Sequence, residues 1–449
     1  MTRMTVVEHY DVAIVGGGLI GLSCAYELTA KGFKVAVIES SSDAGGLART
    51  IELSNGIKCE AFYHHFFMQD IELSAYIDAL LQDSLIYKQT TMSIFQGGMY
   101  HSWNGLVDLL FSRIIGLRDK LRFVVSTILL SSGSLPANFL ANKSLTVGMK
   151  ILYGRRVYEK IWGPMIHGKF GSEAANTALE WMAGRLSQRL SSRSRGVEYL
   201  GFLPGSLSRL TQAMSDYINT SNCRLYCNSL AVSVRKVDAI VNRCYDISIK
   251  NKLNSDGPES LRADQIIFTI SSSKVDNVLA SLDGYEGNWH KDKYYRAVCV
   301  LLELRESISD FYWNNIADLA CFFTGYIEQT QLTGVEEYGG LVIGYLTKYL
   351  APSDPSYDLN ISDLKKLALS DLQIIAPQFK MDNLIQLNVS IAEDAQVVTP
   401  IGYKPNEESI SAIPGVKLVN ISMTYPDERG INNAIKLGKH AAKLAEMHK

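Results

Sequence analysis

The feature that most constrains this chain is a glycine-rich turn between an apolar strand and a helix near the N-terminus. Residues 10–15 (YDVAIV) predict a β-branched strand, residues 16–21 (GGGLIG) form the turn, and residues 22–31 have helical periodicity. In this pattern Gly16 permits a tight turn, Gly18 lets the backbone approach a phosphate, and Gly21 lets helix and strand pack closely. The helix N-terminus adds unpaired N–H groups and a partial positive charge. The sequence therefore predicts a dinucleotide-binding unit.

A second strand and an acidic residue complete this unit. Residues 33–38 (FKVAVI) predict the strand, which ends at Glu39, 18 residues after Gly21. A carboxylate there can accept hydrogen bonds from both ribose hydroxyls of an adenosine, and it repels a 2′-phosphate, which disfavours NADP. A GxGxxG pattern alone is weak evidence, but a complete strand–turn–helix–strand–acid unit of about 30 residues is the context that supports it.

The residues after Glu39 indicate which dinucleotide is bound. Ser40 leads to residues 45–50 (GGLART), in which a Gly-Gly pair precedes Arg49. This segment resembles the second signature of the FAD-dependent amine oxidase superfamily, which includes protoporphyrinogen oxidases, phytoene desaturases and UDP-galactopyranose mutases. In that family the glycines lie close to the pyrophosphate and ribityl portion of FAD, and the arginine adds positive charge. The resemblance implies FAD and an α/β fold, with a Rossmann-like FAD-binding domain that carries an inserted α+β substrate domain.

Later segments extend the resemblance. Residues 225–237 and 245–249 are similar to the family's strands beneath the adenine, and residues 262–269 are similar to the strand that returns to the ADP. A strand at 416–421 and a helix at 431–447 resemble the final element, whose helix N-terminus points at the flavin pyrimidine. A helix N-terminus there stabilises the negative charge of reduced flavin.

The C-terminal strand departs from the family pattern. Many members end it with a Gly-Asp pair, whereas this chain has Val419-Asn420. In members with covalent flavin, a cysteine near this loop makes the bond, but no cysteine follows Cys321 here, so we expect noncovalent FAD. The residues that the motifs and the resemblance assign to FAD are Gly16, Gly18, Leu19, Ile20, Gly21, Glu39, Ser40, Gly45, Gly46, Leu47, Ala48, Arg49, Val232, Thr269, Asn420, Gly430, Ile431 and Asn432.

The resemblance implies a discontinuous FAD-binding domain. It comprises residues 1–75, 195–290 and 390–449, and residues 76–194 and 291–389 form the substrate-binding domain. Residues 76–194, which we call the first insert, have the pattern of helices, and residues 291–389, the second insert, have the pattern of strands. A site between the two domains is a common place for a small-molecule pocket.

Four residues are candidates for catalysis. His64 and His65 follow the first FAD unit, and one of them could move a proton because a histidine pKa lies near neutrality. If the segment is extended, the two face opposite ways and at most one reaches the flavin. Arg429 precedes Gly430 in the flavin loop, and Lys348 follows an apolar strand at the place of the lysine that holds a water near flavin N5 in many amine oxidases. The alternative for the histidines is a hydrogen-bonded pair in an aromatic core.

The first insert is rich in arginine. Arginine forks bind carboxylates and phosphates bidentately, so a subset of these residues could hold an anionic substrate. The alternative is a solvated helix face, and it is favoured because surface arginines are common. The residues are Arg155, Arg156, Arg185, Arg189 and Arg193.

The resemblance implies an FAD-dependent oxidoreductase of the amine oxidase or desaturase type, with hydride transfer from a small organic substrate to flavin N5. The alternative is a non-redox flavoenzyme that resembles UDP-galactopyranose mutase and acts on a nucleotide sugar. A protein that uses FAD only as a structural element is a third reading. The substrate class remains open between an amine, a polyene or lipid, and a nucleotide sugar, and the electron acceptor and oligomeric state are not predicted.

Composition excludes several other classes. The net charge of −2 gives no electrostatic reason to expect nucleic acid as a partner. The seven cysteines lack paired CxxC spacing, which argues against a disulfide framework and against a zinc site, so no metal is expected. We expect free thiols in a reducing cytoplasm, and the N-terminal residues lack the pattern of a signal peptide.

No stretch approaches the roughly 20 apolar residues that span a bilayer. Residues 106–130 mix apolar residues with Arg113, Arg118, Lys120 and Arg122. This pattern permits peripheral membrane contact through a helix that rests on a lipid surface. The favoured alternative is a helix pair of the substrate domain packed on its own core.

Overall fold

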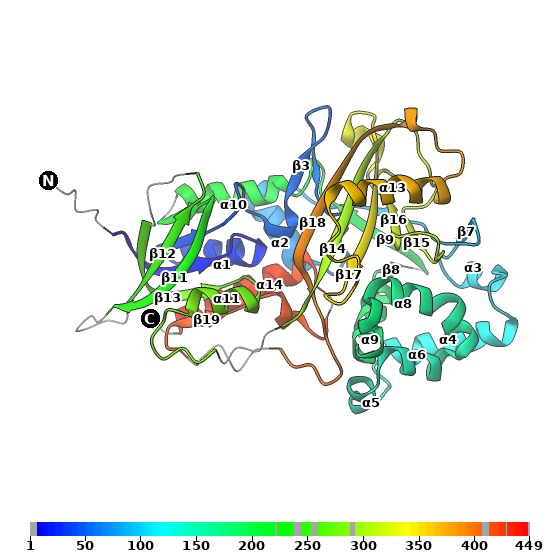
Figure 1. Ribbon diagram of the computed structural model, residues 1–449, viewed down its shortest axis with the longest axis horizontal. Helices are drawn as coiled ribbons and strands as arrows, with labels where there is room; N and C mark the ends of the chain where they lie inside the picture. The colour runs from blue at the N-terminus through cyan, green and yellow to red at the C-terminus, as the bar shows by residue number, and fades with distance from the viewer. Residues whose placement is uncertain are drawn as a thin grey trace.

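The computed structural model describes residues 7–194, 196–220, 222–237, 244–253, 259–287, 292–405, 413–427 and 429–447. Within these residues, two seven-stranded sheets lie side by side, and a group of helices packs beside the second (Figure 1). The first sheet and its helices combine blue, green and red segments, which include the C-terminal helix (Figure 1). The second sheet and the helical group form the other side of the molecule.

The first sheet has the strand order β10-β2-β1-β13-β12-β11, with β19 beside β13. Parallel pairing joins β1 to β2 and β13, and Ile14 lies opposite Val37 and Ile267. The bounds are β1 His9–Val15, β2 Val35–Ile38, β10 Cys223–Tyr226, β11 Ser229–Val237, β12 Cys244–Asn251, β13 Glu259–Phe268 and β19 Val416–Leu418. The predicted Rossmann-like α/β fold is confirmed.

Helices cover both faces of this sheet because its central strands are apolar on both sides. Val12 and Ile14 of β1 face α1 Leu19–Ala30, α2 Ile71–Leu81, α10 Ser208–Thr220 and α14 Ile431–Glu446. Ala13 and Val15 face α11 Ser272–Leu279 on the opposite side. The strand–turn–helix–strand unit predicted at residues 10–38 is present with bounds that differ by at most three residues.

The backbones of helices α1 and α14 lie unusually close together at one point. A Cβ atom at Gly438 of α14 would lie 2.5 Å from Ser23 Cβ and 2.6 Å from the carbonyl oxygen of Ile20 in α1. Only a glycine leaves room for this approach. The contact holds α1 and α14 together along the face of the sheet (Figure 1).

The second sheet has the order β18-β14-β17-β16-β15-β6-β7. Its pairings are antiparallel except that between β15 and β6. One face packs under α13 Ile361–Ile375, and the other faces the loop that contains Ala61 and Phe62. The bounds are β6 Met92–Gln96, β7 Met99–Ser102, β14 Tyr294–Leu304, β15 Trp313–Ile316, β16 Gly325–Glu328, β17 Val342–Leu350 and β18 Leu384–Val397.

The helical group lies in the first insert, as predicted, around a core that includes Tyr153, Trp162 and Leu179. Its helices are α3 Leu106–Phe111, α4 Leu117–Ser131, α5 Ala137–Asn142, α6 Leu145–Tyr153, α7 Arg155–Val157, the π-helical turn Tyr158–Trp162, α8 Gly163–Phe170 and α9 Leu179–Ser191. Smaller elements are β3 Thr50–Glu52, β4 Lys58–Glu60, β5 Ile86–Gln89, β8 Arg193–Ser194, β9 Val197–Phe202 and α12 Thr330–Thr333. No helix of the described residues is both long enough and apolar enough to cross a membrane.

The two large sheets lie largely in the two sets of segments expected for the two domains. Strand β18 crosses the expected boundary at residue 390, and β9, expected in the FAD-binding domain, pairs with β5 of the first insert. The division into an FAD-binding and a substrate-binding domain stays a prediction.

We expect Gly438→Ala to lower the free energy of unfolding by about 1–3 kcal/mol, because the added methyl group must push α1 and α14 apart. His440→Ala is the control, since His440 is exposed on the same helix. Chemical denaturation of both variants measures the difference. Equal stability of the two variants would show that the helices separate without cost.

Candidate active site

A cavity of about 1400 Å³ lies between the first sheet, the second sheet and the helical group. Ligand pockets usually have volumes of about 300–1,000 Å³, so this one has room for a dinucleotide and a second molecule. One end is lined by Gly16, Gly18, Gly45 and Gly46, and the other by α3, α4, α8 and α9.

The first glycine turn is held at the carboxyl end of β1. Gly16 has a φ of +114°, and a Cβ atom there would lie 2.5 Å from Thr269 Oγ1. Thr269 Oγ1 in turn lies within hydrogen-bond distance of the carbonyl oxygens of Val15 and Gly16. Gly21 does not line the cavity, but a Cβ atom there would lie 1.9 Å from the Gly16 carbonyl oxygen. Gly21 therefore acts through close packing of α1 on the turn.

The second glycine turn lies against the first. The backbone N–H of Gly45 donates to the carbonyl oxygen of Gly17 at 2.8 Å, and a Cβ atom at Gly46 would lie 3.1 Å from Gly18 Cα. Gly46 has a φ of +59°, in the left-handed region that favours glycine. Two backbones without side chains thus meet beside the N-terminus of α1 and leave an open cradle there.

Glu39 lies buried next to this cradle. Its carboxylate accepts hydrogen bonds from the backbone N–H groups of Gly17 and Ser41, both at 2.7 Å. A Cβ atom at residue 17 would lie 2.8 Å from Glu39 Cβ, so the carboxylate requires glycine there. Sequence reasoning assigned no role to Gly17, although three consecutive glycines were a signal for it. Glu39 and Ser40 both line the cavity.

Two residues assigned to FAD lie elsewhere. Arg49 does not line the cavity; its guanidinium donates to the carbonyl oxygen of Ile391 at 3.1 Å and lies over the Phe62 ring. Burial lowers the pKa of Arg49. Val232 lies on β11, is 45% exposed and does not line the cavity. The other assigned residues, apart from Gly21, line it: Leu19, Ile20, Leu47, Ala48, Thr269, Asn420, Gly430, Ile431 and Asn432.

The N-terminus of α14 opens onto the same cavity. Its first turn contains no acidic residue, and Gly430 at the N-cap has no side chain to occupy the free N–H groups. The Asn432 side chain caps a different helix, because its Oδ1 accepts hydrogen bonds from the N–H groups of Glu72 and Leu73 at the start of α2. Asn420 Nδ2 donates to the Ile270 carbonyl oxygen at 3.0 Å. Both asparagines therefore position backbone around the cavity.

These features fit FAD. Two helix N-termini face one cavity, and anions are stabilised at such termini. The glycine cradle at α1 has the shape that a pyrophosphate needs, and the buried Glu39 is an acceptor for ribose hydroxyls. The positive end of α14 lies at the C-terminal loop, where the resemblance implies the flavin pyrimidine.

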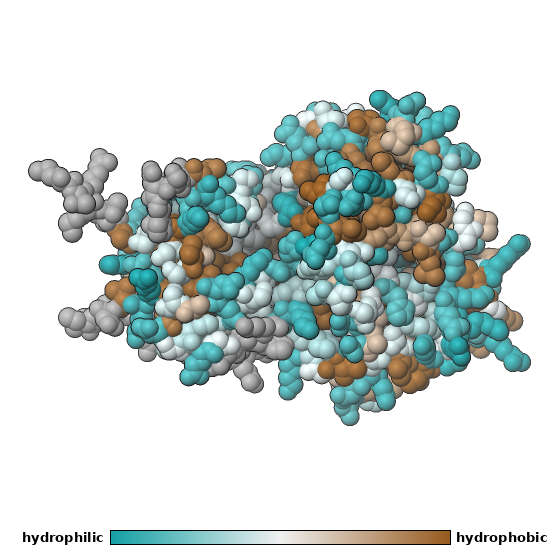
Figure 2. Space-filling view, viewed as in Figure 1, coloured by the Kyte–Doolittle hydropathy of each residue, from teal (hydrophilic) through white to brown (hydrophobic). Residues whose placement is uncertain are grey.

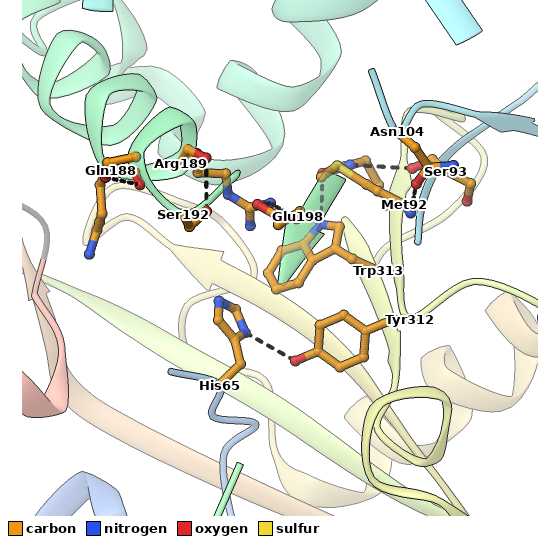
Figure 3. Close-up of polar contacts among 12 residues, drawn as sticks. His65, Met92, Ser93, Asn104, Gln188, Arg189, Ser192, Glu198, Tyr312 and Trp313 are labelled. Atoms are coloured by element: carbon orange, nitrogen blue, oxygen red, sulfur yellow. Dashed lines mark hydrogen bonds and ion pairs between the residues drawn. The ribbon is translucent and has the colours of Figure 1, made fainter. Parts of the chain in front are cut away.

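His64 and His65 both line the cavity, in a segment that is irregular and not an extended strand. That at most one of them reaches the flavin stays a prediction. His64 Nδ1 is buried without a hydrogen-bond partner among the described residues. Burial, with a contribution from the Arg429 charge, lowers the pKa of His64 to about 4. His65 Nδ1 lies 3.0 Å from the Tyr312 hydroxyl, and Figure 3 shows the two side chains pointing toward each other.

Arg429 and Lys348 occupy different surroundings. Both line the cavity. The Arg429 guanidinium donates to the Tyr349 hydroxyl and to the Ala395 carbonyl oxygen, directly before the N-terminus of α14. Lys348 Nζ donates to the Phe322 carbonyl oxygen at 2.9 Å, and burial lowers its pKa. Glu428, beside Arg429 in the sequence, lies outside the described residues.

Cationic side chains stacked on aromatic rings line the cavity near α8 and α9. Lys169 Nζ lies 4.4 Å from the centre of the Trp181 ring, and the Arg185 guanidinium lies 5.6 Å from the same ring. Arg189 lies over Trp313 and within 3.4 Å of Glu198. Figure 3 shows Trp313 between this ion pair and the His65–Tyr312 pair.

The arginines of the first insert thus divide into two groups. Arg185, Arg189 and Arg193 line the cavity. Arg155 and Arg156 are exposed, and they lie near Glu159 and Asp119, respectively. These two arginines therefore lie on a solvated helix face, the alternative that the sequence favours for all five arginines. Sequence reasoning could not separate the groups, because the separation depends on which side of the helical group each residue faces. It also gave no role to Lys169.

One group of described residues has metal-ligand atoms close together. These atoms belong to His9, Cys244 and Asp264 and lie within 4.8 Å of one another. His9 Nε2 and Asp264 Oδ1 already contact each other at 2.9 Å. The group lies on the first sheet, and none of the three residues lines the cavity. All seven cysteines are free.

Comparisons with known proteins agree with this geometry. A family model described as an NAD(P)-binding Rossmann-like domain matches residues 14–80. Hydrogen cyanide synthase subunit HcnC of Pseudomonas protegens is 33% identical over 121 residues, which are 25% of this chain and 28% of that protein. Mitochondrial protoporphyrinogen oxidase of Nicotiana tabacum is 25% identical over 170 residues, which are 36% of this chain and 33% of that protein. The matches span about a third of each relative.

Solved structures match over nearly the whole chain. A protein described as a putative protoporphyrinogen oxidase from Exiguobacterium sp. 255-15 has a TM-score of 0.74 at 17% identity and covers 98% of this chain and 99% of its own. Reduced UDP-galactopyranose mutase has a TM-score of 0.73 at 13% identity, and the match covers 98% of this chain and 96% of that protein. Putrescine oxidase bound to putrescine has a TM-score of 0.70 at 15% identity, and the match covers 98% of this chain and 99% of that protein. This chain has the fold of the FAD-dependent amine oxidase superfamily, so the predicted resemblance is confirmed.

We expect Glu39→Ala to weaken FAD binding by about 1–3 kcal/mol, because the substitution removes a charged acceptor from a buried site. Glu52→Ala is a matched control at an exposed acid of β3. Equilibrium dialysis with a fluorescence assay of free FAD gives both dissociation constants. Equal FAD affinity of the Glu39→Ala variant and the parent would remove Glu39 from the cofactor site.

Proposed function

We propose that this chain is an FAD-dependent oxidoreductase that accepts a hydride from a neutral or anionic organic substrate. The observation that carries the proposal is that the N-termini of α1 and α14 open onto one cavity with a glycine cradle at one end. The likeness in fold to flavoprotein oxidases supports it.

The cofactor in this proposal is noncovalent FAD, which supplies N5 as the hydride acceptor when bound. Gly18 and Gly46 would hold the pyrophosphate, and Glu39 the ribose. The N-terminus of α14 and the Arg429 guanidinium would place positive charge at the pyrimidine end of the ring, where reduction adds negative charge. No cysteine follows Cys321 in the sequence, so the C-terminal loop itself offers no thiol for a covalent bond.

The histidines have separate roles in this proposal. With a pKa of about 4, His64 is neutral at pH 7 and can accept or donate a hydrogen bond without carrying charge. His65 is oriented by the Tyr312 hydroxyl and by the rings of Phe67 and Trp313. An oriented imidazole on the cavity wall is suited to proton transfer with the substrate. Lys348 keeps its Nζ on a backbone carbonyl, so we give it a positioning role.

The charge of the cavity wall argues against a cationic amine as substrate. Along α8, α9 and β8 the lining charged residues are Lys169, Arg185, Arg189 and Arg193, opposed by Glu198 of β9. A protonated amine in this part of the cavity would be repelled by these like charges, whereas a carboxylate or phosphate would be attracted. The apolar lining contributed by Phe123, Met165 and other side chains suits an organic body next to the anionic group.

A second candidate function rests on the same arginines. A non-redox reaction on a nucleotide sugar requires groups that hold a diphosphate, and Arg185, Arg189 and Arg193 could do so from one wall. The fold similarity to UDP-galactopyranose mutase supports this alternative.

Anaerobic mixing of the FAD-loaded protein with substrates of different charge tests the proposal. We expect apolar carboxylates or phosphates to bleach the visible absorbance of oxidised flavin, and putrescine to leave it unchanged. Bleaching by amines alone would contradict the proposed substrate class. Conversion of UDP-galactopyranose without net electron transfer would select the second candidate instead.

We expect Arg429→Met to lower the two-electron midpoint potential of the bound flavin, because it deletes a permanent charge beside the N-terminus of α14. A loss of about 1.4 kcal/mol corresponds to about 30 mV for a two-electron couple. Arg155→Met is the control, since Arg155 is 85% exposed on the surface. Potentiometric titration measures the three proteins. An unchanged or higher midpoint in Arg429→Met would place the guanidinium away from the flavin.

A further inference from the structure

Helices α3 and α4 expose an unusual amount of apolar surface. Phe111 is 82% exposed and Leu117 is 78% exposed. Around them lie further exposed apolar side chains of the same two helices, and we call the whole set the α3–α4 face. Its members are Leu106, Val107, Leu110, Phe111, Leu117, Leu121, Val125, Ile128 and Leu129. Contiguous exposed apolar surface of this kind marks an interaction site.

Helix α4 is apolar on two sides. Ser126 and Leu130 are buried, and Phe123 and Val124 pack on the core of the helical group. Leu117, Leu121, Val125 and Ile128 recur at spacings of four, four and three, which places them on one exposed stripe. The favoured expectation, a helix packed on its own core, accounts for the first side only. Among the described residues no element covers the second side.

Basic residues are interspersed in the sequence among the members of the α3–α4 face. Residues 106–131 contain Arg113, Arg118, Lys120 and Arg122 but only two acidic residues, Asp108 and Asp119. Arg156 lies 3.7 Å from Asp119, and Asp108 accepts hydrogen bonds from Ser102 and Asn104. At this end of the molecule, near the α3 and α4 labels of Figure 1, Figure 2 shows brown surface next to protruding teal side chains.

The cavity reaches the same two helices. Leu106, Val107 and Ile128 line it and are also at least 58% exposed, so they lie where the cavity meets the surface. Phe123 and Val124 continue the apolar lining inward from α4. Arg193 extends to this region as well, because its Nη1 lies 3.8 Å from the place of a Cβ atom at Gly105, the residue before α3.

We propose that the α3–α4 face docks on an anionic lipid surface, with the mouth of the cavity against the lipid. The apolar stripe matches the acyl region and the flanking cations match the headgroups, which is the arrangement of an interfacial amphipathic helix that lies in the plane of the membrane. A protein partner or a second copy of this chain would have to match both the stripe and the surrounding cations. The docking does not depend on the proposed reaction.

Co-sedimentation of the FAD-loaded protein with vesicles tests the proposal. Vesicles of phosphatidylcholine alone are compared with vesicles that also contain phosphatidylserine. The test variant is Phe111→Ser/Leu117→Ser. The control is Leu253→Ser/Leu319→Ser, which removes two apolar side chains that are 75% and 94% exposed elsewhere. A third variant, Arg113→Gln/Arg118→Gln, tests the charges.

We expect parent and control to bind phosphatidylserine vesicles alike and the α3–α4 variant to bind roughly tenfold or more weakly. The arginine variant should lose the preference for anionic vesicles. Retained flavin absorbance confirms that each variant is folded. The proposal would be overturned if the Phe111→Ser/Leu117→Ser variant bound the vesicles as well as the parent. It would also be overturned if the parent sedimented without vesicles. A dimer in analytical ultracentrifugation that this variant dissociates would assign the face to a second copy instead.

Discussion

The backbone contact between α1 and α14 is the constraint on which the rest of the site depends. Gly438 brings the two helices to van der Waals distance at Ser23 and Ile20. Their N-termini therefore open onto one cavity, although they are separated by more than 400 residues of sequence. The glycine cradle beside α1 and the C-terminal loop before α14 can then serve one extended ligand. In the proposed complex, the N-terminus of each helix supplies partial positive charge where FAD carries or gains negative charge.

The two ends of the cavity are lined by different kinds of chemical group. The end at the first sheet is built from backbone: glycines that exclude side chains, free N–H groups, and asparagines that hold loops and helix starts in place. The end at α8 and α9 is built from side chains, with Lys169, Arg185 and Arg189 stacked on tryptophan rings. Stacking orients the Lys169 and Arg185 cations over the Trp181 ring, and Arg189 is also paired with Glu198. Backbone groups thus define the end at the first sheet, where we propose the cofactor, and cationic side chains are prominent at the end where we propose the substrate.

Local sequence predicted the first end well and the second end poorly. Residues 10–50 contain the strand, turn, helix and acid within one short unit, so each feature has a signal that does not need the rest of the chain. The role of Asn432 could not be predicted, because its side chain caps α2, which lies far away in sequence. Arg155 and Arg185 look alike in the sequence, and only the tertiary packing of the helical group places one on the surface and the other in the cavity. Val232 was assigned by resemblance, and it lies exposed on β11, away from the cavity lining.

A crystal structure of the FAD-loaded protein is the most direct test of the central claim that one dinucleotide bridges the two helix N-termini. The account predicts electron density for the pyrophosphate between Gly18 and Gly46, and for the isoalloxazine ring beside Gly430 and Arg429. A ring that points away from α14, or a purified protein whose cradle holds a dinucleotide without a flavin, would contradict it.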